Sequence, residues 1–432
     1  MSAAVEARLS AIETVLADLI PRLVPDPRPG RGRPAILPAA LLWAGMLVCI
    51  LRHDGSQRAI WRLLTAHGLW GWPRIGFSDD AVYRRLARTG STTMAPLFAA
   101  ITDLLMDEGP GDLTLAPFAT EVLALDETTL DPVARRAGYR GLAPGDDRLI
   151  PGKVRALFEV RCQLFRRVTL GDDWRENEKA QASDMVADLP AGSLLLTDLG
   201  YFSFPWYDAL TDAKQHWIAR LREKTSSTVA HVYWERNGHR DALVWLGAYR
   251  SDKAKHLVRL VEIRHGQTTR RYLTNVTDPA KLSMAEVVRL SARRWDIELA
   301  FKTLKTDLGL AVLWSGKGPV IQTQVWAVLV IAQIAFHLRF LIATRAGVDR
   351  FDVSLLLLLK DLPRFAERGE DPVAAIAALG KFGGFLRPSR RVRYDLPDPD
   401  ALIPPPPDLV RERAPRYAGR RCGPGGADRR PE

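Results

Sequence analysis

The spacing of apolar and polar positions divides the chain into four regions of different expected structure. Residues 1–115 carry apolar positions at helical spacing, so we expect a helical N-terminal domain. Residues 116–221 alternate short, β-rich apolar runs with one or two helices, the pattern of a mixed α/β sheet. Residues 222–280 are strand-like and contain the hairpin-turn pair Asn237-Gly238, and residues 281–390 return to a helical pattern.

The C-terminal segment, residues 391–432, is rich in Pro, Gly and Arg, and we expect a disordered tail there. Two uncharged stretches, residues 34–51 and 319–338, are long and apolar enough to be candidate membrane spans. The first stretch is interrupted by prolines, and the second contains several Gln residues and a His. A bilayer core tolerates such polar side chains poorly. We therefore expect buried helices in a soluble, cytoplasmic protein. The helix at 322–341 is apolar nearly all round, which suits either the core or a partner, and His337 within it is expected to be a hydrogen-bonded core residue.

The charge composition of the chain favours a polyanionic binding partner. The 432 residues include 61 Lys and Arg against 50 Asp and Glu, a formal net charge of +11. This balance favours DNA or RNA first and an anionic membrane surface second. Cys49, Cys162 and Cys422 are scattered without metal-ligand spacing, as expected for reduced thiols in a cytoplasm.

The most informative helical pattern lies at residues 283–308. Ser283 and Glu286 form a capping-box pattern, which marks the start of a helix. One side of this helix is an apolar stripe of Leu290, Ile297, Phe301, Leu304 and Leu308. Beside the stripe runs a polar line of Ser291, Arg294, Glu298, Lys302 and Lys305. A lone carboxylate among cations fits either ordinary i,i+4 ion pairs on an amphipathic helix or a functional site.

Two further acids favour the functional interpretation. Asp126 follows the run VLAL and Asp198 follows SLLLT, so each is expected at the end of a short apolar strand, where the active sites of α/β sheets gather. Taken singly, either acid also fits a solvated strand end. Together with Glu298, they supply the carboxylate oxygens that two adjacent Mg²⁺ ions need as shared ligands.

The same residues carry a resemblance to a known family. The segment Arg-Trp-Asp-Ile-Glu at 294–298, followed by Phe301, Lys302 and Lys305, resembles the signature of bacterial insertion-sequence transposases of the IS-four type. That signature is Tyr, two residues, Arg, three residues, Glu, six residues and Lys, and Arg294, Glu298 and Lys305 have these spacings. Residues 123–130 and 198–201 resemble the blocks around the family's first and second Asp.

The resemblance implies an RNase H-like mixed sheet, interrupted by a β-rich insertion at 222–280 and flanked by helical regions. It implies a DNA transposase that cuts element ends and joins them to target DNA. Asp126, Asp198 and Glu298 would hold two Mg²⁺ or Mn²⁺ ions per active site, and Arg294 and Lys305 would hold phosphates. The expected partner is double-stranded DNA, namely terminal inverted repeats and target, bound by a homodimer in the bacterial nucleoid.

One position departs from the signature, because Ser291 stands where the family has Tyr. Serine can donate one hydrogen bond to a phosphate, but it has a shorter reach and no ring. A catalytically decayed or repurposed DNA-binding protein of the same fold is therefore the alternative, with a basic RNA-processing enzyme as a third option.

Further DNA contacts are predicted outside the signature line. The resemblance extends to a basic block with Arg220, Arg222 and Lys224, for which a solvated strand end is the other interpretation, and to Trp295 beside Arg294. Trp234 and Trp245 are candidates for stacking on a flipped base, although strand aromatics more often serve packing. The capped helices at 56–64 and 78–88 fit either a helix-turn-helix or a general helical bundle.

Overall fold

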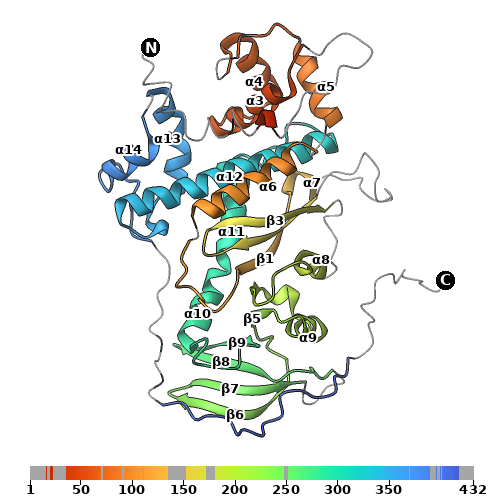
Figure 1. Cartoon of the computed structure of the whole chain (residues 1–432), viewed down its shortest axis with the longest axis vertical. Coiled ribbons are helices and arrows are strands. Elements are labelled where there is room, and N and C mark those ends of the chain that lie inside the picture. The colour runs from red at the N-terminus through yellow and green to blue at the C-terminus, as the bar shows by residue number, and fades with distance from the viewer. Residues whose placement is uncertain are drawn as a thin grey trace, which may run out of the picture. The chain divides into compact units, whose positions relative to one another are not determined.

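We describe the protein from a computed structural model that covers residues 36–69, 72–89, 92–109, 111–134, 152–171, 181–247, 252–368, 370–389 and 401–417, with positions 16, 20–22, 396 and 399. The chain forms two compact units. Figure 1 labels the helices and strands of both. Unit 1 consists of Met1–Asp112, Asp126–Glu176 and Asp296–Val392, and unit 2 of Leu113–Leu125, Asn177–Trp295 and Arg393–Glu432. Each unit therefore joins segments that are far apart in the sequence. The predicted boundaries at 115, 221 and 280 mark changes between helical and strand-like sequence patterns, and the borders of the two units lie elsewhere.

The N-terminal part of unit 1 is helical, as predicted. Its helices are α3 (Ala39–Leu51), α4 (Gln57–Arg62), the π-helix η1 (Leu63–His67), α5 (Asp79–Thr89) and α6 (Met94–Glu108). The Ser56 hydroxyl accepts a hydrogen bond from the Ala59 amide and caps α4. The connection between η1 and α5 is longer than the turn of a helix-turn-helix, and α5 packs on both α4 and α12, which favours a helical bundle.

The long helix α12 (Gly318–Ala346) forms the core of unit 1. It packs against α3, α5, α6, η5 (Arg350–Asp352), α13 (Leu355–Arg368) and α14 (Pro372–Leu379). By length and composition α12 could cross a membrane, but 83% of its most apolar window is buried inside the protein. Gln333 is held within it, because its Nε2 donates to Thr102 Oγ1 at 2.7 Å and its Oε1 accepts from the Phe165 amide at 2.9 Å. These contacts confirm the interpretation of this segment as a core helix.

Unit 1 also holds a β-hairpin. Strands β2 (Lys153–Glu159) and β3 (Leu164–Gly171) pair antiparallel, the second half of β1 (Val122–Thr129) lies beside β2, and α7 (Asp131–Ala134) follows β1. Phe158 and Phe165 of the hairpin pack on Phe336 of α12, and Phe165 also packs on Phe301. Because these rings are buried, the hairpin is fixed to the helices of the unit.

Unit 2 is built on a mixed sheet in the order β1-β4-β5-β9-β8-β7-β6, which confirms the α/β fold class expected from the sequence. The first half of β1, β4 (Leu194–Thr197) and β5 (His216–Arg220) are parallel, and the four others are antiparallel: β6 (Ser227–Arg236), β7 (His239–Leu246), β8 (Val258–His265) and β9 (Thr268–Thr274). The β-rich segment therefore extends the sheet, because β9 pairs with β5. Asn237 and Gly238 have φ values of 53° and 80°, as the predicted hairpin turn requires.

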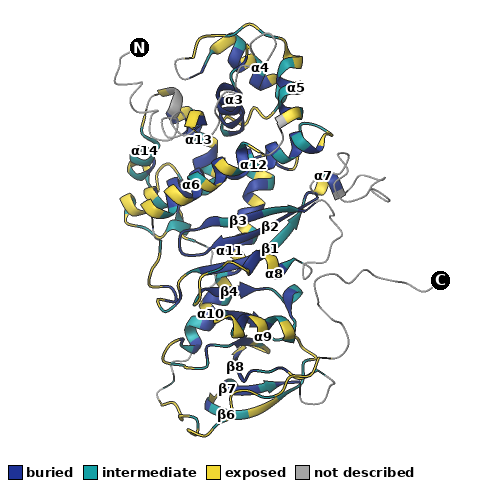
Figure 2. Ribbon diagram, turned by 45° about the vertical axis from the view of Figure 1, so that its right-hand side comes forward, coloured by how far each residue is buried: buried dark blue, intermediate teal, exposed yellow. Residues whose placement is uncertain are grey.

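Helices α8 (Ala182–Val186), α9 (Phe204–Asp212) and α10 (Met284–Arg293) complete unit 2, together with the 3-10 turn η3 (Leu199–Tyr201). Figure 2 shows the buried strands of the sheet as dark segments. Helix α10 packs on β5 and β9. Its start carries the capping box that the sequence predicted, in which the Glu286 amide donates to Ser283 Oγ and the Ser283 amide donates to Glu286 Oε2.

The expectation of a single helix over 283–308 is wrong, because the segment is divided into three helical elements. α10 ends at Arg293, α11 spans Trp295–Lys302, and the π-helix η4 follows at Thr303–Asp307. The wider π turn is closed by the bond from the Leu308 amide to the Thr303 carbonyl at 3.0 Å. A π turn inserts an extra residue, so Lys305 is rotated off the polar line that uniform helical spacing predicts. The border between the units also falls here, after Trp295.

The expectation of a tail disordered from residue 391 is wrong for residues 401–417, which we call the C-terminal strap. The Ile403 amide donates to the Tyr233 carbonyl at 2.9 Å, and the strap then pairs its backbone with the segment before β8. Leu409 packs against the buried cluster of Tyr233, Leu243 and Leu257. Composition misses this, because a Pro-rich segment can still bind the edge of a sheet that other parts of the chain build. Of the rest of the predicted tail, residues 391–395, 397–398, 400 and 418–432, with Cys422, lie outside the described residues.

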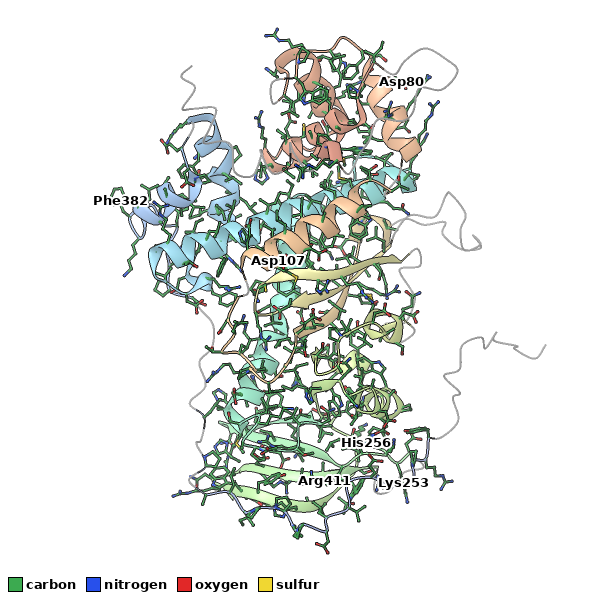
Figure 3. All side chains as sticks on the ribbon, viewed as in Figure 1. Asp80, Asp107, Lys253, His256, Phe382 and Arg411 are labelled. Carbon is green, nitrogen blue, oxygen red and sulfur yellow. The ribbon has the colours of Figure 1, made fainter. Side chains whose placement is uncertain are left out.

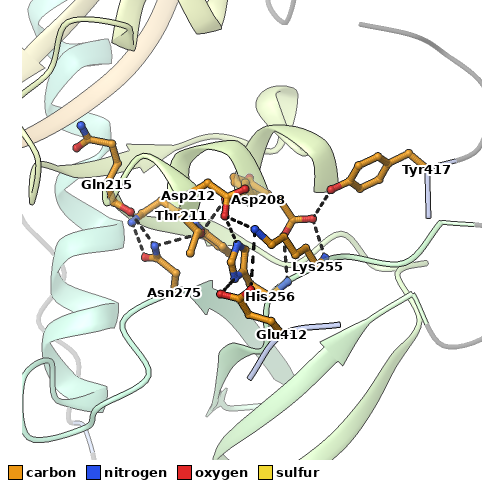
Figure 4. Close-up of polar contacts among 11 residues, drawn as sticks. Asp208, Thr211, Asp212, Gln215, Lys255, His256, Asn275, Glu412 and Tyr417 are labelled. Atoms are coloured by element: carbon orange, nitrogen blue, oxygen red, sulfur yellow. Dashed lines mark hydrogen bonds and ion pairs between the residues drawn. The ribbon is translucent and has the colours of Figure 1, made fainter. Parts of the chain in front are cut away.

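Polar contacts fix the end of the strap to α9 (Figure 4). Asp208 accepts hydrogen bonds from the Lys255 amide at 2.8 Å and from the Tyr417 hydroxyl at 2.8 Å. Asp212 lies 2.6 Å from Lys255 Nζ and 2.8 Å from His256 Nε2. Lys253, His256 and Arg411 mark this end of unit 2 in Figure 3. The strap is thus an integral part of unit 2.

Candidate active site

The first predicted acid, Asp126, lies inside a strand. The expected strand end at this residue is wrong, because β1 continues to Thr129. Only the exposure of the whole residues, backbone included, rises after Leu125. The next residue, Glu127, is held by two cations of β2, Lys153 and Arg155, with Arg155 Nε 3.0 Å from Glu127 Oε2. These three side chains are at most 8% exposed, so the Glu127 carboxylate belongs to a buried ion cluster. Sequence reasoning did not identify this cluster, since its members lie on two strands.

The second predicted acid, Asp198, follows β4 directly, as expected. Its side chain is 41% exposed. Within unit 2, Leu125 of β1 lies opposite Thr197 of β4 in the parallel ladder. Asp126 and Asp198 are the residues that follow these two partners. The ladder within unit 2 thus ends at a pair of residues that are each followed directly by a predicted acid.

Arg294 contacts a carboxylate in this structure, whereas the sequence predicted a phosphate ligand. Its Nη2 lies 3.7 Å from Asp198 Oδ1, a distance that makes an ion pair but is too long for a hydrogen bond. The Arg294 side chain is only 8% exposed, and its guanidinium lies 5.1 Å from the centre of the Trp295 ring. Trp295 itself is 57% exposed. Arg294 is thus a nearly buried cation beside one of the predicted metal ligands.

The third predicted acid, Glu298, is half-buried on α11 in unit 1. Two residues before it, Asp296 is 2% exposed and accepts a hydrogen bond from Gln163 Nε2 at 2.8 Å. Gln163 belongs to the turn between β2 and β3, where its φ of 63° is left-handed, and it also donates to the Val160 carbonyl. This bond ties α11 to the hairpin and so positions Glu298. The sequence carries no signal for it, because the partners are 133 positions apart.

Comparison with known proteins decides the family. The family model described as "Transposase DDE domain" matches residues 118–333, which is half of the chain. The chain belongs to this family. The matched span contains the three predicted acids with Arg294 and Lys305, so the resemblance to insertion-sequence transposases of the IS-four type is confirmed.

Two individual proteins illustrate the relationship. The chain is 24% identical over 272 residues to "Transposase InsG for insertion sequence element IS4" from Escherichia coli (strain K12), and the match covers 58% of this chain and 59% of that relative. It also matches the cryo-EM structure of a piggyBac transposase synaptic complex with hairpin DNA, at 10% identity over 84% of this chain and 78% of that one. The TM-score of 0.42 is too low for this second likeness to bear on fold or function.

The remaining residues that the transposase resemblance assigns to DNA differ in their surroundings. Arg220 at the end of β5 is exposed, as are Arg222 and Lys224 in the turn that follows and Lys302 on α11. Ser291 on α10 is half-buried. Lys305 lies in η4 with its Nζ 3.4 Å from Asp131 Oδ1, so an acid of unit 1 already balances its charge. The DNA contacts of all these residues stay predictions.

The two tryptophans of the β-rich segment are less suited to base stacking than the exposed Trp295. The guanidinium of Arg413, from the C-terminal strap, lies 4.7 Å from the centre of the Trp245 ring and covers it. Trp234 is half-buried on β6. His337 is buried on α12, as predicted, and its Nε2 lies 3.3 Å from a carboxylate oxygen of Glu108. The geometry of this contact is not that of the hydrogen bond that the sequence predicted.

The donors available for a metal are hard carboxylate oxygens, the ligand type that Mg²⁺ and Mn²⁺ prefer. Within the described ranges, no three His, Cys, Asp or Glu side chains are gathered closely enough to hold an ion. Asp126 and Glu298 belong to unit 1 and Asp198 to unit 2. The donor chemistry and the half-buried positions of these acids fit a divalent ion, while the assembled three-carboxylate site stays a prediction.

Proposed function

We propose that this chain is a DNA transposase that cuts the ends of a mobile element and joins them to target DNA. Membership of the DDE transposase family supports the reaction class. The observation that carries the proposal is the register of β1 and β4, in which Leu125 faces Thr197 and each is followed by an acid. In open α/β sheets, ligands bind beyond the carboxyl ends of adjacent parallel strands.

In this proposal Asp126, Asp198 and Glu298 hold two Mg²⁺ or Mn²⁺ ions. When bound, such ions activate a water or a 3′-hydroxyl and stabilise the leaving oxygen of an in-line displacement. Asp296 keeps Glu298 in place through its bond to Gln163. Lys302, Lys305 and the exposed block of Arg220, Arg222 and Lys224 bind phosphates, which gives affinity without sequence information.

The partner is double-stranded DNA, in keeping with the net charge of +11. Both ends of an element must be cut in register, so the active form is a homodimer on DNA. The second candidate is a DNA-binding protein that has lost catalysis, and Ser291 at the signature's Tyr position favours it. The two candidates share DNA binding and differ in metal-dependent cleavage.

A cleavage assay separates them. The full chain is incubated in Mg²⁺ with duplex DNA carrying the inverted repeats that flank its gene. Asp126→Asn, Asp198→Asn and Glu298→Gln are each expected to abolish nicking and strand transfer while retaining DNA binding. Asp103→Asn, in an exposed position on α6, is the matched control and should keep full activity. Nicking by Asp198→Asn would contradict the assignment, and a parent protein that binds these ends without cutting them would support the second candidate.

A further inference from the structure

The ion pair between Asp198 and Arg294 gives one predicted metal ligand a cation from the protein itself. Asp198 lies at the exit of β4, and Arg294 is the residue that follows α10. Their side chains are 41% and 8% exposed, with 3.7 Å between the nearest oxygen and nitrogen. A cation so far removed from water needs a carboxylate nearby to compensate its charge.

The position of Arg294 is set by the fold of unit 2. The buried Arg259 side chain donates to the carbonyl of Leu282, the residue before the capping Ser283, while it also binds Asp241. These bonds fix the beginning of α10, and the packing of α10 on β5 and β9 fixes the rest of the helix. At the far end, the Arg294 guanidinium is placed over the Trp295 ring. Arg294 is therefore a charge held in place by the fold, in contrast to the exposed Lys302 of α11.

A divalent ion bound by Asp198 would use the same carboxylate that Arg294 faces. Two cations that share one carboxylate repel each other, and the repulsion is stronger where the site is shielded from water. We propose that Arg294 is the resident counter-cation of Asp198, which competes with the metal and turns to a DNA phosphate once the metal has neutralised Asp198. This deepens the proposed function and rests on it, since it needs Asp198 to be a metal ligand.

The proposal makes metal binding and DNA binding depend on each other through one side chain. The metal releases Arg294 for a phosphate, and a phosphate that binds Arg294 frees Asp198 for the metal. Because coupling between two ligands is reciprocal, each must raise the affinity of the other by the same factor. Without the charge at position 294, the two affinities become independent.

The test measures Mn²⁺ binding to the full chain without DNA, by electron paramagnetic resonance of the free ion. Arg294→Gln should bind Mn²⁺ roughly fivefold or more tightly than the parent, which is the lower end of usual coupling factors. Arg294→Lys keeps the charge and should bind like the parent. Arg289→Gln, an exposed position on α10 with the same change of net charge, is the control and should also bind like the parent. Unchanged or weaker Mn²⁺ binding by Arg294→Gln overturns the proposal.

Asp198→Asn separates this proposal from the function on which it rests. If Asp198→Asn binds Mn²⁺ as the parent does, Asp198 is no metal ligand and the proposed site itself fails. If Asp198→Asn loses Mn²⁺ while Arg294→Gln has no effect, only the counter-cation role fails. A double-mutant cycle of these two variants, read from metal-free unfolding, gives a measurement that needs no metal: coupled losses support the ion pair, and additive losses refute it.

Discussion

The buried ion pair of Asp241 and Arg259 offers the sharpest test of how unit 2 is held together. Arg259 Nε lies 2.7 Å from Asp241 Oδ1 and its Nη2 lies 2.6 Å from Oδ2, a bidentate pair between β7 and β8. The two side chains are 0% and 1% exposed. The change Asp241→Asn removes the negative charge at nearly constant volume, so it leaves the guanidinium buried without a counter-charge.

Breaking a buried pair in this way costs about 3–5 kcal/mol of unfolding free energy. In a folding unit of about 150–250 residues, each kcal/mol lowers Tm by about 2–4 °C, so Asp241→Asn should lower the Tm of unit 2 by about 6–20 °C. Asp361→Asn is the matched control, because Asp361 pairs with Arg364 at 2.8 Å but the Arg364 side chain is 72% exposed. An exposed pair contributes at most about 1 kcal/mol, so the control should scarcely change Tm.

Scanning calorimetry is the assay, because it can resolve the transitions of two units. The double change Asp241→Leu with Arg259→Met removes both charges and should recover most of the loss, since a well-packed apolar pair replaces a buried ion pair at little cost. Asp241→Asn should also impair the site, because Arg259 holds the Leu282 carbonyl before α10. Equal Tm values for Asp241→Asn and Asp361→Asn would refute the reasoning.

Two further predictions concern titratable side chains. Burial raises the pKa of Cys49 and of Cys162 to about 12, so in a Cys422→Ser protein neither thiol should react with a disulfide reagent at about pH 8 until urea unfolds the chain. Rapid labelling of the folded protein would contradict this. The hydrogen bond from Lys255 lowers the pKa of Asp212 below its ordinary value of 3.8, and His256 adds to this effect. A lowered carboxylate pKa contributes stability above the unfolded value and loses it as the pH falls through the folded value. The difference in urea midpoint between the parent and Asp212→Asn should therefore be constant near neutral pH and shrink below about pH 3.8, and a difference that persists in stronger acid would exclude this role.

Much of the local structure was predictable because its causes lie within a few residues of the chain. The capping box of Ser283 and Glu286 and the turn at Asn237-Gly238 are such cases. The strand before Asp198 was readable from a short apolar run for the same reason. The family signature also needed only spacing along the sequence.

The errors arose where an element depends on its neighbours. β1 continues past Asp126, although its apolar run ends at Leu125. The helix at 283–308 contains a π turn that uniform spacing does not reveal. Residues 401–417 have the composition of a disordered segment, yet they have partners on the edge of a sheet that other parts of the chain build.

The sequence by itself thus determined which side chains are candidates for chemistry, namely Asp126, Asp198, Glu298 and the cations near Glu298. Tertiary structure alone decided which charge faces which. Arg294 stands beside Asp198, and Asp296 is anchored by Gln163. The physical reason is that caps, turns and helical periodicity are set by interactions within about one turn of the chain, whereas counter-ions and burial are set by strand order and packing between distant segments.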